Sequence, residues 1–224
     1  IIIFLIVGGL IYYFWPKKSV APDFKMPAPL KISSLEVFDN GNGTVTVFGE
    51  INNPNEQVGV NPLVYTVNLF NKNGKKVFTK SLETFIYPGR NRTIVEPGID
   101  VLSIEVDRGE IFLNEIVWQA ADKFGDIPEK NLAVENTTIK GIRGGSGFVI
   151  SGVLKNSNPI KLDKVLIKAV LFNKNNLRES ASQTVVVNLA AYQSQNFSIE
   201  APIKADAVSR VDSTRTKIIL EIER

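Results

Sequence analysis

The sequence contains no cysteine and no histidine among its 224 residues. Without thiols the chain has neither disulfides nor a cysteine nucleophile, and without imidazole it lacks the side chain that most often acts as a general base. Zinc sites of the usual Cys/His kind are excluded for the same reason. The chemistries that remain are carboxylate-only hydrolysis and oxygen-ligated metal sites.

Excess charge is also scarce, because the formal net charge is only +3, which is too small for a nucleic-acid-binding protein. The charge is unevenly spread, however. Residues 30–131 carry 10 Lys and Arg against 14 Asp and Glu, whereas residues 132–224 carry 13 against 8. This asymmetry fits either a solvated surface with an accidental bias or a salt-sensitive attraction between the halves or between copies.

The one long hydrophobic run lies at the start of the sequence, from Ile1 to Trp15. A helix of this length rises about 22 Å, less than the roughly 30 Å hydrocarbon core of a bilayer. Because the chain also begins with Ile, we expect a transmembrane anchor over residues 1–16 whose first turns are missing. Aromatic residues at positions 12–15 suit the headgroup layer, and Pro16 ends the helix.

Cleavage and orientation of this anchor stay open. A cleaved signal peptide fits the same run, but the small-x-small site at residues 19–21 is followed by Pro22, a poor residue after a cut. Lys17 and Lys18 favour a cytoplasmic location for this end, although orientation depends on the charges on both sides of the span. Closely spaced prolines predict that residues 17–29 form an extended stalk of about 30–40 Å.

An internal repeat organises the rest of the chain. The letters LFNKN occur at residues 69–73 and again at 171–175. Upstream, residues 44–55 match 147–159 at an offset of 103 instead of 102, and the one-residue change falls in a loop, where insertions are tolerated. The chain therefore carries two copies of one domain-sized unit.

Apolar residues alternate with period two beside the LFNKN letters, which predicts a strand with one face on a core. The predicted core faces consist of Leu63, Tyr65, Val67 and Leu69 in the first copy and Val165, Ile167, Ala169 and Leu171 in the second. Asn73-Gly74 predicts a tight hairpin with both residues at positive φ, and Asn175-Asn176 predicts the same turn in the copy. Residues 110–123 could be read as a helix, but their alignment with residues 217–223 favours a strand.

Short strands with Gly, Asn and Pro turns and no helical period predict an all-β chain with two tandem immunoglobulin- or fibronectin-III-like β-sandwiches after the transmembrane helix. We expect sandwich 1 at residues 30–125, a linker at 126–131 and sandwich 2 at 132–224. The Gly-rich segments 39–44 and 141–148 are predicted hairpins, not calcium or phosphate loops.

Residues 49–77 and 86–91 together resemble the FxLYD domain family, and they are similar to the water-stress-hypersensitivity domains of late-embryogenesis-abundant proteins. Residues 69–71 and 171–173, Leu-Phe-Asn in both copies, stand where that family has Leu-Tyr-Asp. Residues 53–55 supply its Asn-Pro-Asn turn.

The match has departures, because Val67 and Ala169 replace the leading Phe and the second copy lacks the Pro-Gly of residues 88–89. The resemblance implies a fibronectin-like sandwich, often anchored in bacterial envelopes, with no established catalytic residues.

Two groups of residues are candidates for chemistry or binding. The carboxylate pairs Glu105/Asp107 and Glu221/Glu223 share strand faces, and we interpret both as solvated because no predicted cleft or stacking aromatics surround them. The outer face of residues 165–172 is more apolar than its counterpart in the first copy. Leu166, Val170 and Phe172 on that face are either a partner-binding patch or a surface covered by loops or by the neighbouring domain. We predict no catalytic, cofactor-binding or metal-ligating residue.

Together these features predict a single-pass membrane protein of a bacterial cell envelope with extracytoplasmic β-domains. It would act as a non-catalytic interaction or spacer module, contacting the lipid bilayer through its anchor and an envelope partner through its domains, without cofactor or nucleic acid. One alternative is a stress-protective, chaperone-like protein of the water-stress type. Another is a carboxylate-dependent carbohydrate-active enzyme.

Overall fold

The computed structural model describes residues 26–101, 105–143 and 145–223. The predicted anchor and residues 17–25 of the predicted stalk therefore lie outside the described residues. Within the described ranges, no helix is long and apolar enough to cross a membrane.

Strands make up most of the described chain. They are β1 (Lys31–Asp39), β2 (Thr44–Asn52), β3 (Val58–Asn71), β4 (Lys76–Ile86), β5 (Asn91–Asp100), β6 (Val106–Ala120), β7 (Leu132–Gly141), β8 (Gly147–Asn156), β9 (Leu162–Phe172), β10 (Arg178–Leu189), β11 (Ser194–Pro202) and β12 (Lys217–Glu223). The helical elements are the short turns η1 (Ala121–Lys123), η2 (Pro128–Asn131), α2 (Ala205–Val208) and η3 (Ser213–Arg215). The predicted all-β class is confirmed. Of the segment 110–123, which was predicted as a strand, residues 110–120 belong to β6 and residues 121–123 form the turn η1.

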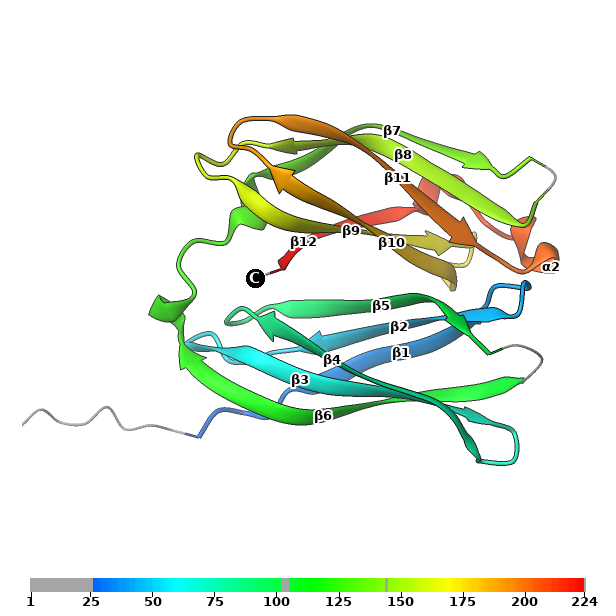
Figure 1. Cartoon of the computed structure of the whole chain (residues 1–224), viewed down its shortest axis with the longest axis horizontal. Coiled ribbons are helices and arrows are strands. Elements are labelled where there is room, and N and C mark those ends of the chain that lie inside the picture. The colour runs from blue at the N-terminus through cyan, green and yellow to red at the C-terminus, as the bar shows by residue number, and fades with distance from the viewer. Residues whose placement is uncertain (1–25, 102–104, 144, 224) are drawn as a thin grey trace, which may run out of the picture.

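The strands form four three-stranded antiparallel sheets. Sheets β1-β2-β5 and β4-β3-β6 enclose one core, and sheets β11-β8-β7 and β10-β9-β12 enclose a second. The described residues therefore form two β-sandwiches joined through η1 and η2 (Figure 1).

Burial confirms the predicted core faces. Leu63, Val67 and Leu69 of β3 are fully buried in the first core, and Val165, Ile167, Ala169 and Leu171 of β9 are fully buried in the second. Each of these strands is the middle strand of its sheet, so its inner face is shielded on both sides by its neighbours.

The LFNKN hairpins have a different turn from the one expected. Among the central residues only Gly74 and Asn176 have positive φ, at 74° and 61°. The turn from residue 71 to residue 74 ends on the left-handed Gly74, so the loop is one residue longer than a two-residue hairpin. The side chain of Asn71 sets this loop, because its Oδ1 accepts from the amides of Asn73 and Lys75, at 3.1 and 3.0 Å. Asn173 does the same in the copy.

A buried asparagine after β2 and another at the end of β8 close matching turns. Asn53 donates to the carbonyls of Val58 and Tyr87, at 2.8 and 3.1 Å. Asn156, 103 residues later, donates to the carbonyls of Ile160 and Ala190, at 3.0 and 2.9 Å. Because a buried amide needs partners, these contacts fix the loops at the end of each sandwich where the linker lies.

The two sandwiches lie side by side and make four layers (Figure 1). The outer face of sheet β1-β2-β5 meets the outer face of sheet β10-β9-β12. Both sandwiches point the same way, because β1 and β7 both start at the end of the molecule where the linker crosses (Figure 1). The surfaces that meet are therefore different faces of the repeated unit.

Candidate functional site

The surface between the sandwiches, here called the junction, has an apolar centre. Phe48 and Val95 of the first sandwich pack against Val170 and Ala181 of the second, and all four are at most 2% exposed. Phe38, Phe172 and Ile219 surround them. These side chains point away from their own cores, so it is the neighbouring sandwich that removes them from water.

Beside this centre lies a buried ion cluster, defined as Arg92, Lys168 and Glu221. The Lys168 ammonium donates to the Glu221 carboxylate and to the carbonyl oxygen of Thr93. The Thr93 amide donates to Glu221 Oε1 at 2.8 Å. From β5 of the first sandwich, Arg92 Nε lies 3.3 Å from Glu221 Oε2, and Arg92 Nη1 donates to the Ile222 carbonyl at 3.0 Å. One carboxylate thus joins cations from both sandwiches.

Burial and mutual attraction act in opposite directions on these groups. Burial lowers the pKa of Lys168 to about 8, although the Glu221 charge partly opposes this shift. Burial alone would raise the pKa of Glu221, but the charges of Lys168 and Arg92 outweigh it and hold that pKa below its ordinary value. Burial, with the Glu96 charge, raises the pKa of the nearby Tyr65 hydroxyl, so that group stays neutral.

A second ionic contact crosses the junction through Arg178 of β10. Its guanidinium reaches Glu36 at 2.5 Å, Glu50 at 3.3 Å and the Ser34 hydroxyl at 3.1 Å, all on the first sandwich. It also lies over the Phe48 ring, 4.6 Å from the centroid. This contact has the sign expected from the charge asymmetry, with acids of the first half meeting a cation of the second.

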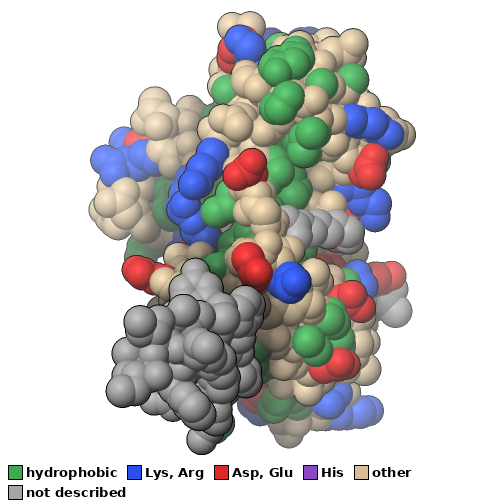
Figure 2. Space-filling view, turned by 90° about the vertical axis from the view of Figure 1, so that its left-hand side faces the viewer, with side chains coloured by type: hydrophobic (Ala, Val, Ile, Leu, Met, Phe, Trp, Pro, Cys, Tyr) green, Lys and Arg blue, Asp and Glu red, His purple; other side chains and the backbone are tan. Residues whose placement is uncertain are grey.

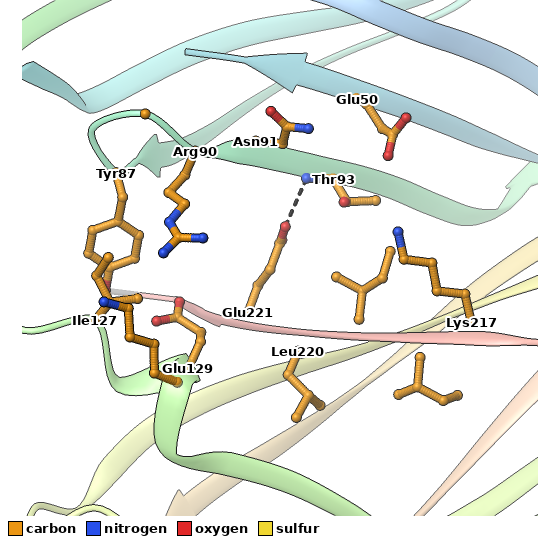
Figure 3. A pocket seen from close by; sticks show the side chains of 14 residues that line it. Glu50, Tyr87, Arg90, Asn91, Thr93, Ile127, Glu129, Lys217, Leu220 and Glu221 are labelled. Carbon is orange, nitrogen blue, oxygen red and sulfur yellow. Dashed lines mark hydrogen bonds between the residues drawn. The ribbon is translucent and has the colours of Figure 1, made fainter. Parts of the chain in front are cut away.

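A cleft of about 580 Å³ opens where the junction meets the linker. It lies between the start of β5, the turn η2 and strand β12, and its labelled side chains converge from both sandwiches (Figure 3). Its lining includes the acids Glu50, Glu129 and Glu221 and the cations Arg90, Lys130 and Lys217. This volume is in the range of small-molecule sites.

Each acid of the cleft is already engaged within the protein. Glu50 pairs with Arg178, and Glu221 belongs to the ion cluster. Glu129 Oε1 accepts from the Ile222 amide at 3.0 Å. Because their partners hold them across the junction or to strand β12, these carboxylates act here as structural contacts.

The predicted patch lies on the covered side of the second sandwich. Leu166 and Val170 are 7% and 1% exposed, and Phe172 packs beside the junction centre. The first sandwich occupies this face, which is one of the two interpretations that the sequence left open.

The interpretation of Glu221 as a solvated carboxylate was wrong, because the residue is only 8% exposed. Its neighbour Glu223 is half-buried and lies 3.5 Å from Lys164. Glu105 is exposed and pairs with Lys72, as a solvated carboxylate would. A lysine at position 168, in the middle of an otherwise apolar strand face, was the signal for a buried partner of opposite charge.

Comparison with known proteins does not identify the chain. No protein-family model matches it, and no curated protein does. Solved structures with weak similarity include a Bacteroides uniformis β-glucuronidase, at 13% identity, 81% coverage of this chain and a TM-score of 0.24. The covalent complex of Bacteroides uniformis β-glucuronidase 2 with cyclophellitol-6-carboxylate aziridine gives the same values.

A calcium-binding mutant of that second enzyme gives 11% identity, 84% coverage and a TM-score of 0.24. This chain spans 26–28% of the length of those chains. TM-scores at this level are too low to bear on fold or activity.

Proposed function

We propose that this protein is a non-catalytic module of a cell envelope, tethered to a lipid bilayer through its N-terminal segment. Its two immunoglobulin- or fibronectin-III-like sandwiches act as one rigid body that holds a binding surface at a fixed place beyond the membrane. The observation that carries the proposal is the buried junction. The packed apolar centre makes two loosely linked domains unfavourable, because separation would expose it to water, and the ion cluster fixes which groups meet across the junction.

The attachment of the first described residues supports this orientation. The backbone amide and carbonyl of Ala28 exchange hydrogen bonds with the Asn55 side chain, both at 2.8 Å. The chain is thus fixed to the end of the molecule where the linker and the cleft lie (Figure 1). A tether entering there would place this end nearest the bilayer and the LFNKN hairpins farthest from it.

A carbohydrate-active enzyme has less support. Glycoside hydrolysis needs two carboxyl groups free to exchange protons or attack the sugar. The acids of the cleft are held by Arg178, by the ion cluster and by a backbone amide. No observation on the described residues favours the stress-protective alternative.

Proximity labelling of the full-length protein in its own membrane tests the proposal. A labelling enzyme fused to the C-terminus of the protein is expected to label envelope proteins, and to do so only when the labelling reagent reaches the outer side of the membrane. Labelling of cytoplasmic proteins alone would reject the proposal. So would recovery of the protein in the soluble fraction, and not in the membrane fraction, after the cells are lysed.

A further inference from the structure

The cleft at the linker end combines engaged acids with free cations. Arg90, Lys130 and Lys217 line it, and within the described ranges none of the three forms an ion pair with a carboxylate. All three are exposed to solvent. Of the acids, Glu50 pairs with Arg178 and Glu221 belongs to the ion cluster, whereas Glu129 forms no ion pair among the described residues. A ligand in the cleft would therefore meet three cations against one unpaired carboxylate, an excess of positive charge.

The cations come from separate elements and lie apart. Arg90 ends the turn before β5, Lys130 belongs to η2, and Lys217 begins β12. In Figure 3 Arg90 lies at one end of the cleft, near Tyr87 and Glu129, and Lys217 lies at the other end, near Thr93. This separation suits a ligand with more than one anionic group, spaced along a chain, better than a single small anion.

Glu129 adds a second, independent feature. Its Oε1 is used by the Ile222 amide, but its Oε2 is buried and has no hydrogen-bond partner in the described part of the chain. A buried acceptor without a donor costs free energy, which a hydroxyl or amide N–H of a ligand would recover if the Glu129 side chain turned toward the cleft. Figure 3 shows the Glu129 carboxylate on the cleft wall, opposite Arg90.

We propose that the cleft binds an anionic glycan, a sugar chain that carries carboxylate or phosphate groups beside its hydroxyls. Arg90 and Lys130 take one anionic group and Lys217 another, while a sugar hydroxyl donates to Glu129 Oε2. A neutral glycan would make no ionic contact with the three cations. A polyanion without hydroxyls would offer no donor to Glu129 and would be repelled by its negative charge. The choice of a glycan over other polyanions rests on the proposed envelope location. The preference for an anionic ligand rests on the charges of the cleft and does not depend on that location.

The end view of the molecule fits a ligand that reaches the cleft from solvent. Figure 2 looks onto the end where the linker crosses, and charged side chains of both signs lie along the boundary between the two sandwiches. A flexible glycan of the surrounding envelope would meet this end without entering the closed part of the junction.

Calorimetric titration of the full-length protein in detergent tests the proposal with defined probes. These are oligogalacturonate, a phosphorylated oligomannoside, neutral maltoheptaose, inorganic polyphosphate and a single-stranded oligodeoxynucleotide. We expect saturable binding of one or both acidic glycans that weakens with salt, and no binding of maltoheptaose. The two acidic probes distinguish carboxylate from phosphate recognition.

Two variants locate the binding. Replacing Arg90, Lys130 and Lys217 together with Ser should weaken acidic-glycan binding about tenfold or more. A triple Ser variant at Lys75, Lys140 and Lys174 removes the same charge from exposed positions outside the cleft lining and should change affinity less than about twofold. Equal losses in both variants would overturn the assignment to the cleft.

Glu129→Gln separates a glycan from a simple polyanion. The variant should bind acidic glycans several-fold more weakly, because an NH2 group replaces the oxygen that accepts the sugar hydroxyl. It should bind polyphosphate more tightly, because the negative charge of Glu129 is gone. Tighter binding of both probes, preference for the oligonucleotide, or no binding of any acidic glycan would overturn the proposal. Since titration in solution does not depend on cellular location, failure here would leave the labelling test of the proposed function unaffected.

Discussion

Removing the Glu221 carboxylate is the perturbation that the junction should resist least. Glu221→Gln keeps the size of the side chain but leaves Lys168 and Arg92 buried together without a counter-charge. The carbonyls of Thr93 and Ile222 and the new amide oxygen would then contact these cations, and the Glu96 charge would still favour the charged form of Lys168. Breaking a buried ion pair from one side typically costs about 3–5 kcal/mol.

For a protein of this size, 1 kcal/mol corresponds to about 2–4 °C in the midpoint of thermal unfolding. Glu221→Gln should therefore lower the midpoint by about 6–20 °C. The second sandwich is also expected to unfold apart from the first, because the variant weakens the contact that couples them. Differential scanning calorimetry of the full-length protein in detergent would show the midpoint shift and a split transition.

The loss should depend on pH in a defined direction. Burial lowers the pKa of Lys168 to about 8, and Glu221 is the group that opposes this shift, so the variant should lower that pKa further. Between the folded-state pKa and the ordinary pKa of lysine the unfolded chain binds more protons, so stability rises with pH there. In the variant this rise begins at lower pH, so its deficit against the natural protein should shrink between pH 6 and pH 9.

Glu115→Gln provides the matched control. Glu115 faces Val64 across the sheet of the first sandwich, as Glu221 faces Leu166 in the second, but it is exposed. We expect its midpoint to change by less than about 2 °C. Similar midpoints for both variants, or a Glu221→Gln deficit that grows with pH, would refute the assignment of a buried ion cluster.

Three further outcomes follow from the same structure. Asn156→Ala leaves buried carbonyls without donors and should cost about 1–3 kcal/mol in urea unfolding; no loss would show that the amide does not hold the turn. Gly59→Ala places a Cβ 2.4 Å from the Phe124 ring and should cost about 1–3 kcal/mol, whereas Gly141→Ala, whose Cβ meets nothing within 4 Å, should be nearly neutral. On acidification the contribution of Glu221 should be present above about pH 4.5 and be lost as pH falls through its lowered folded-state pKa. Unfolding midpoints from pH 6 to pH 2 check this, and a Glu221→Gln variant with the same acid profile as the natural protein would contradict it.

The sequence was sufficient for the two cores because alternation with period two specifies which side chains face inward. The fully buried faces of β3 and β9 follow directly from that pattern. Turn chemistry was predicted less well, since Asn73-Gly74 allows a tight two-residue loop and the chain uses a longer turn with only Gly74 left-handed.

The packing of one sandwich against the other could not be predicted. The period-two alternation shows which residues point away from a core, but it does not show what covers those residues. Leu166 and Val170 were equally compatible with a partner surface and with a domain contact. The corresponding outer faces, which point away from the junction, have a different composition. Ser151 stands 103 residues after Phe48, and Asn68 stands 102 before Val170, so these free faces lack the large apolar residues of the junction centre.

Whether the two sandwiches form one rigid body is tested most directly by a spin-label distance measurement. The chain has no cysteine, so Thr79→Cys and Ser198→Cys place single labels at exposed positions of β4 and β11, on the two outermost sheets. A rigid junction predicts one narrow distance distribution that broadens when Glu221→Gln is added. A broad distribution in the natural background would contradict the account.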